Sequence, residues 1–166
     1  MTVAVVPIAP LHAASFRAAL DIVAREKRYL AMVEAPALEQ VHSFVAGNVE
    51  RGVPQFVALE GDRVVGWADI VPSATHGTAH RGSLGMGVLP SYRGVGVGRA
   101  VLGACITKAW TNGLTRVDLE VRADNLPAIA LYKALGFQHE GVRERGMHID
   151  GEYFDTLLMG LLRDLG

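Results

Sequence analysis

Residues 84–110 read LGMGVLPSYRGVGVGRAVLGACITKAW, and the other predicted elements of the chain are organised around this stretch. Leu84, Met86 and Val88 alternate with glycines, which is the period of a β-strand. After a glycine-rich segment at 93–99, apolar residues recur every three or four positions, which is the spacing of a helix. A strand, a glycine-rich loop and a helix N-terminus form an anion site, because unpaired N–H groups and the positive end of the helix dipole point at the loop. The stretch therefore predicts a pyrophosphate-binding loop.

Two glycines, Gly85 and Gly87, lie inside the predicted strand. Because glycine has no side chain, a ligand or another backbone can lie directly against a strand that contains it. We therefore expect a close approach at this strand.

The spacing of the loop residues narrows the kind of pyrophosphate site. A Walker loop ends in Gly-Lys-Ser/Thr, whereas Gly98 is followed here by Arg99. A Rossmann fingerprint, Gly-x-Gly-x-x-Gly, is also absent, since the final position holds Arg99 or Val101. The pattern that is present is Arg-x-x-Gly-x-Gly, at Arg93, Gly96 and Gly98.

This pattern, placed directly after a strand, resembles the acetyl-CoA signature of the GNAT superfamily of N-acetyltransferases. A second block, residues 125–137, resembles the Asn-x-x-Ala-x-x-Leu-Tyr-x-x-x-Gly-Phe block of the same superfamily. Two blocks in the usual order are more specific than either alone. The whole chain is similar to bacterial small-molecule members, including the phosphinothricin-acetyltransferase-like group.

Composition limits the other possibilities. The chain has 166 residues with 16 basic and 17 acidic side chains, so no bulk charge favours nucleic acid or an anionic membrane. No apolar run approaches the roughly 18 residues of a membrane span, and no export signal is recognisable. A single cysteine excludes an intrachain disulfide and suits a reducing compartment. We predict one domain over residues 1–166, in the cytoplasm.

Cys105 lies on the apolar stripe of the predicted helix, so it is interpreted as a packing residue rather than a nucleophile. No Cys-x-x-Cys pair accompanies the six histidines. We therefore predict no metal site.

Hydrophobic periodicity and turn signals predict the remaining elements. Strands are predicted at 2–8, 55–60, 63–71, 114–121, 139–149 and 153–162, and helices at 12–25, 38–49 and 128–135. The Gly61-Asp62 and Asp150-Gly151 pairs indicate two hairpins. The order is that of an α/β (α+β) chain with a mixed, mostly antiparallel sheet. The resemblance implies the GNAT fold, with about seven strands and about four helices.

The resemblance also implies that acetyl-CoA is the cosubstrate. In the superfamily, strand amides at the positions of Met86, Gly87 and Val88 bind the pantetheine arm and polarise the thioester carbonyl. Asn125 would meet the same arm, and Tyr132 would sit beside the sulfur. The loop residues implied to bind the pyrophosphate are Arg93, Gly94, Val95, Gly96, Val97, Gly98 and Arg99.

Acyl transfer to an amine requires a proton to leave the amine and a donor for the departing thiolate. We assign Tyr132 as the donor and Glu120 as the base, by resemblance to the ribosomal-protein alanine acetyltransferases. Simpler roles stay open: a helix cap for Asn125, packing for Tyr132, and for Glu120 a solvated carboxylate or an ion pair with Arg122. Glu34 is a second candidate base.

The predicted function is transfer of an acetyl group to a primary amine of a small molecule. Tyr29, Glu34 and His80 are candidate substrate residues in early or polar loops. Protein N-terminal acetylation and a CoA-binding domain without turnover remain as alternatives. An apolar closing segment, 157–162, and the pairing common in the family predict a homodimer.

Overall fold

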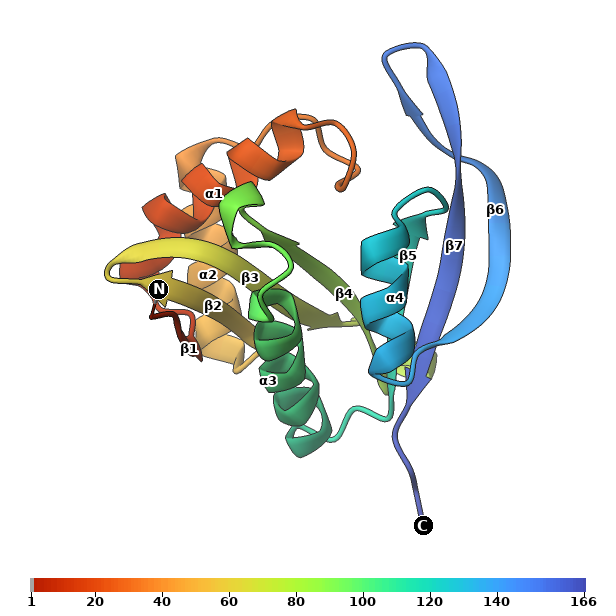
Figure 1. Ribbon diagram of the computed structural model, residues 1–166. Coiled ribbons are helices and arrows are strands. Elements are labelled where there is room, and N and C mark those ends of the chain that lie inside the picture. Colours follow the sequence, from red (N-terminus) through yellow and green to blue (C-terminus); the bar gives the residue numbers. More distant parts are fainter. Residues whose placement is uncertain (1) are drawn as a thin grey trace.

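A seven-stranded sheet runs through the computed structural model, which describes residues 2–166 (Figure 1). Its strands are β1 (Ala4–Pro7), β2 (Gln55–Glu60), β3 (Arg63–Pro72), β4 (Arg81–Val88), β5 (Arg116–Arg122), β6 (Gln138–Ile149) and β7 (Glu152–Leu162). The α-helices are α1 (Ala13–Arg25), α2 (Leu38–Arg51), α3 (Val97–Thr111) and α4 (Leu126–Ala134). Three short 3₁₀ helices lie at Pro10–His12, His76–Thr78 and Pro90–Tyr92. The predicted order of strands and α-helices is confirmed.

The strands are arranged β1-β2-β3-β4-β5-β7-β6, and only the β4–β5 pair is parallel. The predicted mixed, mostly antiparallel sheet is therefore confirmed. Both predicted hairpins form, β2–β3 and β6–β7. At the second turn Asp150 and Gly151 have φ of 51° and 80°, the left-handed values that a two-residue hairpin turn requires.

Helices cover both faces of the sheet, with α1 and α2 on one face and α3 and α4 on the other (Figure 1). Successive strand residues point to opposite faces. On β3, Trp67 faces α1 and packs edge-on against Phe16, with ring centroids 5.6 Å apart. The preceding residue, Gly66, faces α3, where a Cβ on it would lie 3.0 Å from Val97. Trp67 is only 2% exposed and belongs to the hydrophobic core.

The glycines of β4 make room for side chains of β3. A Cβ at Gly87 would lie 2.3 Å from the ring of Trp67, and one at Gly85 would lie 3.3 Å from Oδ1 of Asp69. The close approach predicted from these glycines exists. Side chains of β3 make this approach on the α1 face of β4. Gly85 and Gly87 also line a cavity at the open edge of the strand. Burial raises the pKa of the Asp69 carboxyl to about 7, because the charged form is poorly solvated there.

Replacing Gly87 by alanine should destabilise the protein by about 1–3 kcal/mol, because the added methyl group overlaps the fixed ring of Trp67. The midpoint of denaturant unfolding measures this loss. Gly103→Ala is the matched control, since nothing lies within 4 Å of a Cβ at this position in α3. It should leave stability unchanged or raise it slightly, as alanine favours helix. Equal midpoints for the two variants would contradict the expectation.

Cys105 of α3 is fully buried, and its Sγ donates a hydrogen bond to the carbonyl oxygen of Ala68 at 3.0 Å. Burial raises the pKa of this thiol well above its usual range. A thiol that stays protonated is a poor nucleophile. The predicted packing role is confirmed.

Over residues 2–166, no helix is both long and apolar enough to cross a membrane. Within the same residues, no three histidine, cysteine, aspartate or glutamate side chains are grouped to hold a metal ion.

Candidate active site

Strands β4 and β5 separate after a short paired segment. Their parallel pairing covers only residues 81–83 of β4 and 116–118 of β5. Beyond this point no further pairs join the two strands among the described residues, and Figure 1 shows them diverging. A cavity of about 760 Å³ lies at the opening, lined by β4, β5, α4, residues 93–99 and the loop after α1.

The edge of β4 directs backbone groups into this opening. In an antiparallel pair, every second residue turns its N–H and C=O toward the neighbouring strand. The N–H of Leu89 donates to the carbonyl of Val65 (2.9 Å), and β3 and β4 pair without a bulge, so the odd-numbered residues face β3. The N–H groups that face the opening therefore belong to Leu84, Met86 and Val88. Gly87 lines the cavity, but its own amide faces β3.

Residues 93–99, the glycine loop, border the other side of the cavity. Gly94 and Gly96 have φ of 75° and 91°, which side chains rarely tolerate. Gly96 precedes α3 without a side-chain cap, so the first N–H groups of the helix are unpaired. Gly98 lets the helix approach the sheet, since a Cβ there would lie 3.3 Å from Met86. This arrangement is suited to bind an anion.

The loop residues predicted to bind pyrophosphate do not share one environment. Gly94, Gly96, Gly98, Arg93 and Arg99 line the cavity. Val95 and Val97 contribute no side chain to that lining: the first is exposed and the second is packed in the core.

The two arginines of the loop also differ. The guanidinium of Arg93 is occupied by Glu26 and by the carbonyl oxygen of Val88. Among residues 2–166, the side chain of Arg99 makes no ion pair or hydrogen bond. Arg99 is therefore the side chain of this loop that is available to an anion.

Asn125 is the N-cap residue of α4 and lines the cavity. Its Oδ1 accepts the N–H of Ala128 at 3.3 Å, so the helix-cap role that we left open is present. Across the described residues its Nδ2 has no hydrogen-bond partner, which leaves that donor for a ligand.

Tyr132 lies about two turns further along α4, and it also lines the cavity. It is 8% exposed, with its ring centroid 5.7 Å from that of Phe137. Burial raises the pKa of the Tyr132 hydroxyl to about 12, because the phenolate would be poorly solvated. The hydroxyl is therefore protonated at every physiological pH, as an acid must be. It packs against a neighbour as the simpler reading proposed, and it also borders the site.

Glu120 lies on β5 and lines the large cavity. Its side chain points to the opposite face of the sheet from that of its neighbour Val121. Its Oε1 accepts a hydrogen bond from Oγ1 of Thr156 at 2.6 Å, and Arg143 donates to both carboxylate oxygens at 3.1 and 2.9 Å. The ion pair with Arg122 that we left open is wrong. Arg122 instead binds the carboxylate of Asp124 with two nitrogens, at 3.0 and 2.6 Å.

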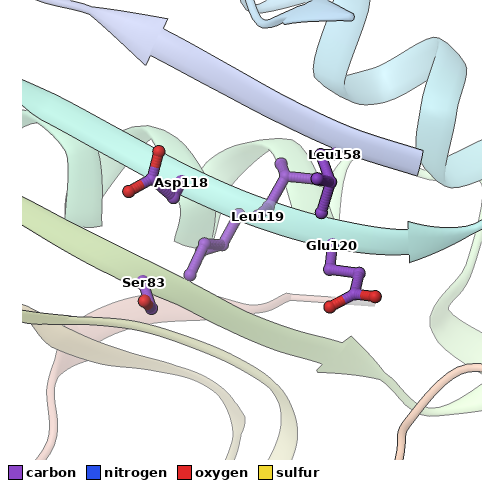
Figure 2. A pocket seen from close by; sticks show the side chains of 6 residues that line it. Ser83, Asp118, Leu119, Glu120 and Leu158 are labelled. Carbon is purple, nitrogen blue, oxygen red and sulfur yellow. The ribbon is translucent and has the colours of Figure 1, made fainter. Parts of the chain in front are cut away.

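A second cavity, of about 330 Å³, borders Glu120 on the face away from α3 and α4 (Figure 2). It is lined by Ser83, Leu84, Asp118, Leu119, Glu120 and Leu158. Leu84, Leu119 and Glu120 line both cavities. Glu120 therefore lies where a molecule entering from one face would meet a molecule bound in the other cavity.

The three predicted substrate residues are placed differently from one another. Tyr29 lines the large cavity, together with Leu30 and Ala31. The side chain of Glu34 is 69% exposed and lies 3.6 Å from Arg25, outside both cavities. His80 precedes β4 at the end where β4 and β5 are still joined, so it lies away from the opening. The structure thus brings only Tyr29 to the site.

Some residues of the site could not have been named from the sequence. Thr156 and Arg143 hold the carboxylate of Glu120, and they come from strands whose register depends on bulges in β6. Glu26 was recognisable only as one charge in a polar loop. The apolar members Leu30 and Met147 carry no motif.

Curated relatives match parts of this chain. It is 40% identical over 79 residues to the mycothiol acetyltransferase of Kocuria rhizophila, covering 46% of this chain and 26% of that protein. It is 38% identical over 72 residues to the ribosomal protein bS18-alanine N-acetyltransferase of Escherichia coli K12, covering 43% of this chain and 49% of that protein. The chain thus spans less than half of the length of these curated relatives.

Solved structures match almost the whole chain. One is a phosphinothricin acetyltransferase from Sinorhizobium meliloti in complex with acetyl-CoA, with a TM-score of 0.92. The two chains are 20% identical, and the match covers 100% of this chain and 91% of the other. At this identity the similarity establishes the GNAT fold, as the sequence predicted.

The model of the Acetyltransferase (GNAT) family matches residues 18–137, a segment that includes the glycine loop, Glu120 and the block from Asn125 to Phe137. This segment makes up most of the 166 residues. The chain belongs to the GNAT acetyltransferase family.

Proposed function

We propose that this protein is an acetyl-CoA-dependent N-acetyltransferase that moves an acetyl group directly to the primary amine of a small molecule. The opening between β4 and β5 carries the proposal, because it joins free backbone donors, a glycine loop at a helix N-terminus and a buried tyrosine in one cavity. Relatives named as acetyltransferases and a similar structure with bound acetyl-CoA support the same activity.

The residues at the opening fit acetyl-CoA. The unpaired N–H groups at the start of α3, with Arg99, suit the pyrophosphate. The free Nδ2 of Asn125 and the edge of β4 suit the amide groups of the pantetheine arm. When bound, acetyl-CoA supplies the thioester. The N–H groups of Met86 and Val88 face the opening, where they can stabilise negative charge on the carbonyl oxygen.

Replacing Gly96 by valine should weaken CoA binding at least tenfold, or about 1.4 kcal/mol. The φ of 91° is unfavourable for valine, and the added bulk would stand beside the unpaired amides. Isothermal titration calorimetry measures the change. Gly52→Val is the matched control, because Gly52 also has a positive φ of 66° but caps α2. Unchanged affinity in Gly96→Val would contradict the assignment of the loop.

Tyr132 and Glu120 can perform the two proton transfers. The protonated hydroxyl of Tyr132 is suited to donate to the departing thiolate. Glu120 lies at the junction of the two cavities, where it can accept a proton from the incoming amine directly or through water. Glu34 is less suitable as the base, because it is exposed and borders neither cavity.

Contacts between the loop after α1 and the β6–β7 hairpin favour a small acceptor. A peptide substrate would need an open groove between these segments. Lys27 instead forms an ion pair with Asp150 at the hairpin turn, with Nζ and Oδ2 3.0 Å apart. Arg122 lies over the ring of Phe154 and donates to the carbonyl of Lys27 at 3.2 Å. These contacts narrow the space that a polypeptide would occupy.

Protein N-terminal acetylation remains the second candidate, since one relative is a ribosomal-protein alanine acetyltransferase. A CoA-binding domain without turnover is the third. Tyr132 and Glu120 both line the large cavity, and this combination of an acid and a base argues against a domain without turnover.

The test is incubation of the pure protein with acetyl-CoA and separate pools of amino acids, other small amines and N-terminal peptides, with thiol release as the readout. Release with a small-amine pool supports the proposal. Release with peptides alone would establish protein acetylation instead. No release with any pool, despite CoA binding, would support the non-catalytic domain.

We also expect a two-fold dimer, in the cytoplasm where acetyl-CoA is available. Exposed apolar side chains on the hairpin, Val142, Tyr153 and Leu162, suit a contact with a second copy. Light scattering at micromolar concentration should return twice the chain mass of 17.8 kDa. A mass of a single chain would contradict this expectation.

A further inference from the structure

The side chain of Arg93 joins three parts of the molecule that meet at the large cavity. Its Nε donates to the carbonyl of Val88, at the end of β4, at 2.9 Å. Its two terminal nitrogens donate to the carboxylate oxygens of Glu26, at 3.0 and 2.6 Å. Its Cζ lies 4.4 Å from the ring centroid of Tyr29. One guanidinium therefore connects the glycine loop and the open edge of β4 to residues 26–37, the α1–α2 loop.

These contacts leave little of Arg93 for a ligand. The side chains of Arg93 and Glu26 are only 31% and 28% exposed, so the pair is partly shielded from water. A bidentate arginine–carboxylate pair is directional as well as attractive, and it neutralises the guanidinium charge. A phosphate would have to displace the carboxylate in order to bind this side chain. Arg99 and the backbone amides have no such competitor.

The α1–α2 loop depends on attachments of this kind. Residues 27–37 contain no helix or strand. The end of the loop is held by α1, because the N–H of Ala35 donates to the carboxylate of Asp21 at 2.9 Å. The start is held by Arg93 and by Arg122, which binds the carbonyl of Lys27. Between the two ends lie residues 29–31, which line the large cavity. They belong to the loop that, under the proposed function, borders the acceptor.

We infer that Arg93 is a positioning residue that couples the cofactor site to the acceptor site. The inference rests on the proposed function, which places acetyl-CoA at the glycine loop. A pyrophosphate on the loop amides fixes the backbone at Arg93, and the guanidinium transmits that restraint to Glu26 and Tyr29. Because coupling between two sites is reciprocal, an ordered α1–α2 loop strengthens CoA binding by the same factor.

Hydrogen exchange of a peptide covering residues 27–33, with and without CoA, tests the coupling. Calorimetry on the same samples measures CoA affinity. In the wild type, saturating CoA should slow exchange in this peptide at least about fivefold. Glu26→Gln should remove most of this slowing, because the ion pair to Arg93 is lost. Glu34→Gln is the matched control: it alters a carboxylate of the same loop, whose partner Arg25 lies on α1, and it should keep the slowing.

Arg93→Met is the second test variant, because methionine lacks the guanidinium but keeps an unbranched apolar side chain. Because the coupling is reciprocal, Arg93→Met and Glu26→Gln should weaken CoA binding by similar factors. Neither factor should exceed the factor by which CoA slows hydrogen exchange in the wild type. Full slowing in Glu26→Gln would overturn the inference. So would CoA affinity more than about tenfold weaker in Arg93→Met than in Glu26→Gln, since the guanidinium would then bind the phosphates itself. Absence of CoA binding by the wild type would overturn the proposed function, whereas normal binding without slowing would overturn the coupling alone.

Discussion

Replacing Tyr132 by phenylalanine should lower turnover by about 10²–10⁴-fold, or roughly 3–5 kcal/mol in the barrier, with CoA affinity nearly intact. The substitution removes the hydroxyl and keeps the ring that packs against Phe137. Because burial raises the pKa of Tyr132 to about 12, the wild-type hydroxyl is protonated well above neutrality. The loss should therefore be the same at every pH between about 6 and 9. Steady-state kinetics on a confirmed acceptor measures it.

A matched control separates the acid role from a general effect of losing a phenol. Tyr153→Phe changes the same group on the β6–β7 hairpin, where the ring is exposed and stacks on His148. It should retain wild-type turnover. If Tyr132→Phe also retains it, the thiolate must obtain its proton elsewhere, and the acid assignment is wrong.

Replacing Glu120 by glutamine should lower activity by about 10²–10⁴-fold, and most strongly at low pH, where the amine is most fully protonated and most needs a base. Glutamine keeps the shape of the side chain and can still bond Thr156, but it cannot accept the proton. The pH dependence of kcat/KM, compared with that of the wild type, reports the change.

Glu140→Gln is the control for this series. Glu140 lies on β6, pairs with Arg116 and lines neither cavity, so the pH profile should stay as in the wild type. An unmoved profile in Glu120→Gln would exclude Glu120 as the base. Ordered water, or Glu34 after a movement of its loop, would then have to take that part.

Most of the secondary structure could be predicted from short-range sequence patterns. The turn pairs at both hairpins, the alternation of β4 and the glycines before α3 each depend on neighbouring residues, and all of these elements form. However, β4 begins at Arg81, before the predicted Leu84, and α3 begins at Val97, inside the segment predicted as a loop. Cavity residues such as Gly96, Asn125 and Tyr132 lie within such short blocks, which is why a single sequence could name them.

Contacts between distant segments could not be predicted in the same way. The glycines of β4 revealed a close approach, but only the register with β3 shows that Trp67 fills the space. The partner of Glu120 is Arg143 and not its sequence neighbour Arg122, because bulges in β6 set which residue lies opposite. Glu34 and His80 were chosen for their chemistry alone, and chain geometry places both away from the cavities.

The divergence of β4 and β5 has a consequence for the lifetime of the protein. It leaves two strand edges without partners in the middle of the sheet, and unpaired edges are templates for aggregation. Acetyl-CoA lying there would shield both edges as an inserted strand does. A ligand that binds only the folded chain stabilises it by about 2.7 kcal/mol at a hundredfold excess over Kd. Under the proposed function, we therefore expect starvation for acetyl-CoA to reduce the amount of this protein in the cell, since the empty form is the one exposed to precipitation and proteolysis.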